Sequence, residues 1–298
     1  MNDKRPFDKV AVLMGGVSAE REVSLRSGAA VARGLAEAGY QATAVDVTAP
    51  ALDLPAGTEA VFIALHGEFG EDGQVQAMLD RAGIPYTGSG ADASRCAFDK
   101  ILSKTRFAEA GIPTPAWAVA PPGQPPPRPL PLVVKPARQG SSFGVHCVRE
   151  AGQWQAALRD AGQYGCDVLA EDYVPGRELT VGIVGDTALP VIEIVAENDW
   201  YDYTAKYTKG RTAYRPPPGL APDAQADIQR LALAAFHALG CRGFGRADFR
   251  LTPDGRPYAL EMNTVPGFTE TSLLPKAAAW TGLSFAALCD AILRLATV

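Results

Sequence analysis

In the first third of the chain, continuous apolar runs alternate with a segment in which apolar residues recur at helical spacing. A continuous apolar run at residues 10–14, ended by glycines at 15–16, predicts a buried strand and a tight turn. Apolar residues at helical spacing follow over 25–36, and a second short apolar run covers 60–65. Strands that alternate with helices predict a parallel α/β domain over residues 1–93.

The remaining two thirds of the chain carry shorter elements. The proline-rich stretch at 121–131 cannot form a helix or a central strand and predicts an exposed loop. Short strands are predicted at 132–135, 145–148, 168–171, 180–184 and 191–195, and amphipathic helices at 228–239 and 285–296. This mixture indicates an α+β class, so the fold class of the whole chain is α/β plus α+β.

A hairpin is predicted around Asp254-Gly255, a typical two-residue turn between two alternating runs. The resulting register places Asp248 opposite Glu261 and Arg246 opposite Asn263, with all four on one face of the hairpin. The other face is then apolar and faces the core, with Ala247, Phe249, Leu251, Tyr258, Leu260 and Met262.

Two interpretations of the polar face remain open. Opposed carboxylates repel each other, but a hard divalent cation turns the same pair into a binding site, with phosphates and water completing its shell. Alternatively, the face is solvated and Arg246 neutralises Asp248. Asn263 adds a neutral oxygen ligand on the same face and favours the metal site.

A glycine-rich loop follows Lys135, at residues 140–144, and its backbone N–H groups are suited to bind phosphates beside the lysine charge. The same letters, GSSFG, match the nucleophile elbow of serine hydrolases, with Ser142 as nucleophile and His237 as base. That motif requires a helix next, whereas residues 145–148 predict a strand. The phosphate loop is therefore favoured, and a hydrolase is the alternative.

Composition narrows the function classes. In 298 residues, Asp and Glu number 33 against 28 Lys and Arg, and the formal net charge of −5 disfavours binding to nucleic acid or anionic membranes. The longest apolar run is far below the ~20 residues of a membrane span, and no signal peptide is recognisable, so we expect a cytoplasmic protein. Five scattered cysteines and three histidines form no C-x-x-C or H-E-x-x-H motif, which disfavours disulfides and zinc.

Five motifs in a fixed order resemble the D-alanine–D-alanine ligase family of the ATP-grasp superfamily. They lie at residues 15–24, 66–73, 140–144, 201–207 and 261–267. The resemblance covers essentially the whole chain and implies an ATP-grasp fold in three parts. These are an N-terminal Rossmann-like α/β domain (1–93), a central subdomain with the glycine loop (94–172) and a C-terminal subdomain with the metal site (173–298). A homodimer is also implied.

The resemblance assigns roles to individual residues. ATP is implied to lie between the last two parts, with two Mg²⁺ or Mn²⁺ ions. The implied nucleotide contacts are Lys100, Lys135, Glu171, Asp172, Tyr173, Val174, Glu178 and Lys206. The implied metal ligands are Asp248, Glu261 and Asn263, the same three residues as in the hairpin. The implied catalytic and substrate-binding residues are Glu20, His66, Ser141, Tyr207, Arg246, Gly267 and Ser272.

The implied reaction joins two D-alanines for peptidoglycan precursor synthesis. ATP phosphorylates the carboxylate of the first D-alanine, and the amine of the second attacks the acyl phosphate. Glu20, Ser141 and Tyr207 are implied to form a hydrogen-bonded triad in the closed site, under a lid at 197–215. The nearest alternative is a related ligase that takes D-lactate or D-serine as second substrate.

The chain departs from the family's pattern in three places, one of which is Glu270-Thr271 beside Ser272. Arg250 stands where an apolar residue is usual, and Met262 where a smaller aliphatic residue is usual. The predicted register places Arg250 opposite Ala259, which adds a positive charge beside the metal face. We expect these departures to tune affinity without changing the reaction.

Overall fold

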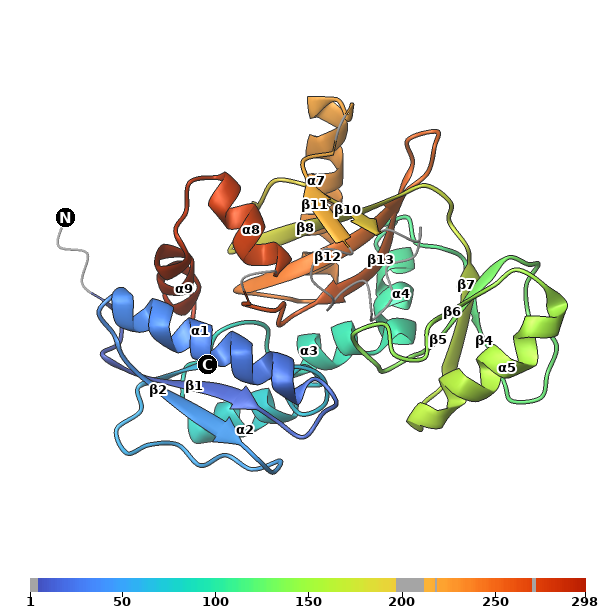
Figure 1. The fold of residues 1–298 in the computed structure, drawn as a ribbon. Helices are drawn as coiled ribbons and strands as arrows, with labels where there is room; N and C mark the ends of the chain where they lie inside the picture. The colour runs from blue at the N-terminus through green and yellow to red at the C-terminus, as the bar shows by residue number, and fades with distance from the viewer. Residues whose placement is uncertain (1–4, 197–211, 218, 270–271) are drawn as a thin grey trace.

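In the part of the chain that the structure describes, three β-sheets form the framework (Figure 1). The computed structural model describes residues 5–196, 212–217, 219–269 and 272–298. The first sheet is parallel and has the order β2 (Gln41–Val47), β1 (Lys9–Gly15) and β3 (Ala60–Ile63). β1 and β3 are almost completely buried, as parallel strands covered on both faces are, and α1 (Arg21–Glu37) packs on β1 and β2. The expected α/β class of this region is confirmed.

The second sheet is antiparallel. Its strands are β4 (Trp117–Val119), β7 (Val168–Asp172), β5 (Leu132–Pro136) and β6 (His146–Val148), in that order. Helix α5 (Ala151–Ala161) packs on β5 and β6 and is followed by a 3-10 turn, Gly162–Tyr164. The proline-rich segment forms the expected loop, and the Trp154 indole N–H donates to the Gln124 carbonyl at 2.7 Å, which ties the loop to α5.

The third sheet is also antiparallel and lies at the centre of the molecule (Figure 1). Its order is β11 (Thr212–Arg215), β10 (Ile192–Ala196), β8 (Arg177–Val184), β12 (Phe244–Leu251) and β13 (Pro257–Asn263), and β9 (Thr187–Ala188) pairs with β8. Helix α7 (Pro222–Ala238) packs on β8, β12 and β13.

The connection between the first two sheets runs through α2 (Gln74–Ala82), α3 (Ala91–Phe98) and α4 (Lys100–Glu109). Both α3 and α4 contact β13 of the third sheet. The division of the chain at residues 93 and 172 stays a prediction. Helices α3 and α4 pack against β13, which that division assigns to the C-terminal part.

The first and third sheets share one hydrophobic core. The Phe62 ring of β3 lies 5.4 Å from the Phe268 ring and 6.1 Å from the Phe244 ring, measured between centroids. Helix α8 (Leu273–Trp280) packs on β8, and α9 (Phe285–Leu293) packs on α1. Residues from the two ends of the chain are therefore held in fixed positions relative to each other.

None of the described helices is, by itself, long and apolar enough to cross a membrane. Helices α8 and α9 reach the necessary length and composition only as a pair, and they bend by 106° at the break between them. The apolar side of α9 is buried inside the protein, at Leu288, Cys289, Ile292 and Leu293.

The β12–β13 hairpin confirms part of the predicted register. Arg246 pairs with Asn263 and Asp248 pairs with Glu261, as expected. The turn itself is longer than predicted: the Thr252 N–H donates to the Arg256 carbonyl at 3.0 Å, and the Gly255 N–H donates to the Thr252 carbonyl at 2.9 Å with Gly255 at φ +84°. This is a three-residue loop with glycine in the left-handed region.

A β-bulge between Asp248 and Phe249 compensates for the longer loop. The extra residue, Leu260, lines a cleft instead of the core, and Ala259 takes its place in the core with 1% exposure. The predictions that Tyr258 and Leu260 face the core and that Arg250 opposes Ala259 are therefore wrong. Arg250 pairs with Tyr258 because the one-residue shift applies between the bulge and the turn.

Candidate active site

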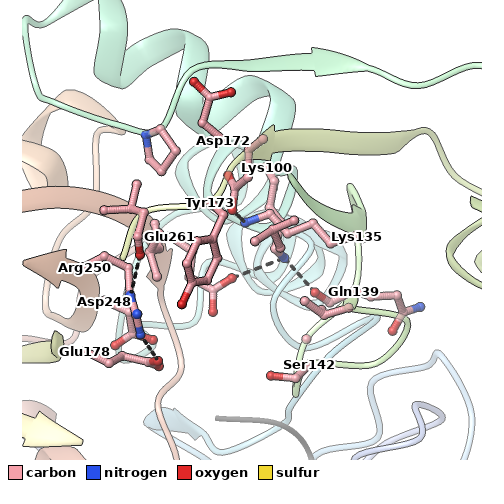
Figure 2. Close-up of a pocket in the computed structure, with 17 residues that line it drawn as sticks. Lys100, Lys135, Gln139, Ser142, Asp172, Tyr173, Glu178, Asp248, Arg250 and Glu261 are labelled. Carbon is pink, nitrogen blue, oxygen red and sulfur yellow. Dashed lines mark hydrogen bonds and ion pairs between the residues drawn. The ribbon is translucent and has the colours of Figure 1, made fainter. Parts of the chain in front are cut away.

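A cleft between the second and third sheets encloses about 810 Å³, part of it open to solvent (Figure 2). The expected nucleotide and metal residues that line it are Lys100, Lys135, Glu171, Asp172, Tyr173, Val174, Glu178, Asp248 and Glu261. Ser142 lines it as well. The structure thus brings together residues from β5, β7, β8, β12, β13 and the start of α4.

The segment that joins β7 to β8 forms one edge of the cleft. The Asp172 N–H donates to the Ala116 carbonyl at 2.9 Å, and the Tyr173 N–H donates to the Pro131 carbonyl at 3.2 Å. The Asp172 carboxylate accepts two hydrogen bonds from Arg128, at 2.7 and 2.8 Å. The Asp172 side chain is therefore engaged with the proline-rich loop and points away from the cleft centre (Figure 2).

A buried triad of charges lies beneath this edge. The Glu171 carboxylate is 2.5 Å from Lys135 Nζ and 2.7 Å from Lys104 Nζ, and the three side chains are at most 7% exposed. Lys104 also donates to Thr114 Oγ1 at 2.7 Å. Sequence reasoning missed Lys104, although its place four residues after Lys100 on α4 puts the two lysines on one helix face.

Burial sets the protonation states of the triad. Burial lowers the pKa of Lys104 to about 8, with the nearby Glu171 carboxylate opposing the shift. Burial alone would raise the pKa of Glu171, but the two adjacent ammonium groups more than offset it and hold that pKa below its usual range. At neutral pH the triad is therefore one carboxylate between two cations.

The polar face of the hairpin combines features of both earlier interpretations. Arg246 forms two hydrogen bonds with Asp248, at 2.8 and 2.7 Å, and Thr180 Oγ1 donates to the same carboxylate at 2.6 Å. Lys100 lies 3.4 Å from Glu261. Arg246 thus neutralises Asp248, while Glu261, whose side chain is 32% exposed, faces the cleft beside it.

The donor set on this face fits a hard cation. Asp248 and Glu261 stand opposite each other on paired strands, and Asn263 follows on the same strand as Glu261. Asn263 Oδ1 accepts from the Val265 N–H at 3.0 Å, and an amide oxygen has a second lone pair for a metal ion. Within the described ranges no group of three His, Cys, Asp or Glu side chains could hold a metal. Two carboxylates plus one amide, completed by phosphates, match magnesium.

Glu20 connects the first part of the chain to the glycine loop. Ser141 Oγ donates a hydrogen bond to the Glu20 carboxylate. Gly140 packs so closely that a Cβ atom there would lie 2.7 Å from Glu20 Oε2. Two members of the expected triad therefore meet. Tyr207 and Lys206, together with most of the expected lid, lie outside the described residues, and residues 212–215 form strand β11.

A second polar cluster lies where β13 ends. Ser27 Oγ is 3.1 Å from His66 Nε2 and accepts from the Phe268 N–H at 3.1 Å. A Cβ atom on Gly267 would lie 2.8 Å from Ser272 Oγ, which accepts from the Thr269 N–H at 2.9 Å. Three of the expected substrate residues, His66, Gly267 and Ser272, therefore belong to one cluster.

Two buried titratable groups stand beside this cluster. Burial lowers the pKa of His66, which favours the neutral imidazole. Burial, together with the charge of Glu20, raises the pKa of Glu71 well above its usual range, although the Gly67 N–H donates to its carboxyl at 3.0 Å. Glu71 was not singled out from the sequence, because a glutamate in an acidic loop gives no signal of burial.

Replacing Glu71 with glutamine should stabilise the protein increasingly as pH rises. The folded protein retains the Glu71 proton in a pH range where the unfolded chain has lost it, so wild-type stability falls as pH rises through that range. Glutamine has no proton to lose and keeps the acceptor for Gly67. Thermal unfolding at pH 5 and pH 8 measures the effect, with Glu68→Gln, an exposed change in the same loop, as control. A melting-temperature difference that is the same at both pH values would contradict this prediction.

Comparison with known proteins gives a consistent result. A family model described as D-ala D-ala ligase C-terminus matches residues 127–294, and one described as D-ala D-ala ligase N-terminus matches residues 49–89. A relative from Methylacidiphilum infernorum named D-alanine–D-alanine ligase is 48% identical over 96% of this chain and 94% of its own length. One of the same name from Syntrophotalea carbinolica is 47% identical over 97% of this chain and 96% of its own length.

Solved structures agree in fold. The D-alanine–D-alanine ligase from Bacillus anthracis complexed with ATP superposes with a TM-score of 0.85, at 30% identity, over 97% of both chains. A second structure of the Bacillus anthracis ligase has a TM-score of 0.84 at 33% identity over the same shares. The expected ATP-grasp architecture is thereby confirmed, and the chain belongs to the D-alanine–D-alanine ligase family.

Proposed function

We propose that this protein joins two D-alanines to D-alanyl-D-alanine, with ATP converted to ADP and phosphate, for peptidoglycan precursor synthesis. The observation that carries the proposal is the cleft itself. It combines two lysines, opposed carboxylates and a glycine loop, and the loop touches Glu20 of the first part of the chain. Such a cleft suits a nucleoside triphosphate whose terminal phosphate faces a second, smaller site.

Within the cleft, the chain's residues divide the work of holding ATP. Lys100 and Lys135 bind phosphate oxygens, the main chain of residues 171–174 binds the adenine, and Glu178 binds the ribose. Asp248, Glu261 and Asn263 would hold Mg²⁺, which supplies positive charge that screens the phosphates during transfer. The buried Glu171 keeps Lys135 oriented through their 2.5 Å contact.

The residues around Glu20 bind and orient the amino acids. Glu20 accepts the ammonium group of the first D-alanine, and the carboxylate of that D-alanine attacks the terminal phosphorus, which gives an acyl phosphate and ADP. The free amine of the second D-alanine attacks the acyl carbon, phosphate leaves and a proton is released. Arg246 and the backbone at Gly267 stabilise the negative charge that develops on the acyl oxygen, while neutral His66 and Ser272 shape the substrate pocket.

Phosphate release from ATP that depends on D-alanine tests this function. We expect release with D-alanine and Mg²⁺, none with L-alanine, and D-alanyl-D-alanine as the product identified by mass spectrometry. D-lactate or D-serine, each offered together with D-alanine, tests the alternative second substrates. ATP binding without D-alanine-dependent phosphate release would refute the proposal.

Replacing Ser142 with alanine should leave most of this activity, because no acyl-enzyme on serine is involved. The hydrolase alternative needs His237 beside Ser142, but His237 is 54% exposed and lies 3.7 Å from Asp186, past the far end of β8. From Glu178 in the cleft to the end of β8 at Val184 the strand extends six residues, roughly 20 Å, and Asp186 lies in the turn that follows. Complete loss of activity with covalent labelling of Ser142 by a serine-directed phosphonate would support the hydrolase instead.

The homodimer and the cytoplasmic location implied by the resemblance are part of this proposal. Sedimentation equilibrium of the purified protein, with and without ATP, tests the dimer. A single species at the monomer mass would contradict it.

A further inference from the structure

Arg250, one of the departures from the family's pattern, lines the cleft beside Glu178 (Figure 2). On β12 it pairs with Glu178 of β8 on one side and, because of the bulge, with Tyr258 of β13 on the other. Its side chain is 11% exposed and that of Glu178 is 19% exposed. A cation is thus built into the cleft wall beside the carboxylate proposed to bind the ribose.

The guanidinium group holds two different parts of the wall. Arg250 Nε donates to the Val174 carbonyl at 3.1 Å, and Nη1 donates to Glu178 Oε2 at 3.3 Å. The planar guanidinium presents its donors in a fixed arrangement, so these two bonds define the position of Glu178 relative to the segment that joins β7 to β8. A lysine has one charged nitrogen and cannot reproduce that geometry.

The same guanidinium contacts the ring of Tyr173, at 6.0 Å from its centroid. Arg149 also contacts this ring, at 5.0 Å, but it follows the end of β6 in the second sheet, whereas Glu178 lies on β8 of the third sheet. The two arginines therefore share the tyrosine contact, and of the two it is Arg250 that stands opposite Glu178 on a paired strand. This difference provides a matched control within the chain.

We propose that Arg250 is a positioning residue that orients the Glu178 carboxylate toward the ribose hydroxyls and thereby sets discrimination between ribonucleotides and deoxyribonucleotides. The inference rests on the proposed nucleotide site. A carboxylate accepts about four hydrogen bonds, so the bond to Arg250 leaves capacity for vicinal hydroxyls. Arg250 acts through Glu178 and the Val174 carbonyl, not on the reacting phosphate.

Calorimetric binding of Mg·ADP, Mg·2′-deoxy-ADP and Mg·3′-deoxy-ADP, without D-alanine, tests the proposal. The wild type should prefer ADP to at least one deoxy analogue. Arg250→Met should reduce that preference about 10–100-fold, the range for losing a hydrogen bond to a charged group. Arg250→Lys should reduce it too, and Arg149→Met should leave it unchanged. The double variant Arg250→Met/Glu178→Gln should show the same preference for ADP over the deoxy analogues as Glu178→Gln alone.

Three outcomes would overturn the proposal: a wild type with no preference, an unchanged preference in Arg250→Met, or an equal loss in Arg149→Met. Thermal unfolding of each variant identifies any that fails to fold, in which case Arg250→Lys supplies the comparison. In the ligation assay, Arg250→Met should raise KM for ATP with kcat nearly unchanged. Since binding is measured without ligation, a protein that binds ADP but does not join D-alanines refutes the proposed function alone.

Discussion

Replacing Glu171 with glutamine should lower the free energy of unfolding by about 3–5 kcal/mol at pH 7, measured by urea denaturation. The change removes the carboxylate that contacts both Lys104 and Lys135 in the triad, and leaves two ammonium groups in a site where Lys104 is 0% exposed. Uncompensated buried charge is among the most destabilising consequences of a single substitution.

The difference in the free energy of unfolding between the wild type and Glu171→Gln should become smaller as pH rises from 7 to 9. Without Glu171, the pKa of Lys104 falls further below its already lowered value of about 8, so the folded variant releases a proton that the unfolded chain still binds. Stability rises with pH wherever the unfolded state binds more protons. Lys104→Met is the matched control, because it leaves the balanced Lys135–Glu171 pair, and its effect should be clearly smaller. Equal effects of the two variants would show that net charge in the triad does not govern stability.

Replacing Glu261 with glutamine should reduce D-alanine-dependent phosphate release by about 10²–10³-fold at saturating substrates, as removal of a preorganised electrostatic contact does. The amide retains the shape of the side chain but loses the charge that, opposite Asp248, would hold Mg²⁺. The fold should survive, since the side chain is 32% exposed and its neighbour Lys100 also donates to the Gln139 carbonyl at 2.7 Å.

A magnesium titration distinguishes metal binding from a general loss of activity. The Mg²⁺ concentration for half-maximal rate should rise in Glu261→Gln, whereas Glu109→Gln, an exposed change on α4, should behave as the wild type. Full activity with an unchanged magnesium requirement in Glu261→Gln would remove Glu261 from the proposed metal site.

The strands that sequence patterns predicted well are those with a strong local signal. Buried runs such as β1 and β3 are apolar without interruption, and parallel strands covered on both faces require this. β2 was not predicted, because an edge strand with mostly exposed positions reads as an ordinary polar segment. Its pairing with β1 joins residues that are about 30 positions apart in the sequence, so no local pattern indicates it.

In the site, Asp248 and Glu261 were correctly predicted to lie opposite each other, but from a turn that the structure does not contain. The pairing of Asp248 with Glu261 follows from a three-residue loop and a compensating bulge, not from the two-residue turn that the sequence favours. Bulges depend on packing between strands and leave little local signal. The burial of Lys104 and Glu71 was equally inaccessible, because it arises only when α4 and the 66–73 loop are covered by other segments.

The separate core of the second sheet has a consequence for cooperativity. Its buried cluster, which includes Leu132, Val134, Trp154 and Leu158, contains no described residue of the other two sheets, whereas the first and third sheets share theirs. Such a unit can open as a whole without disrupting the rest of the protein. A nucleotide bound in the cleft as proposed would contact both the second and the third sheet, so its binding free energy would add to the local stability of β5 and β7 and make the two parts unfold together.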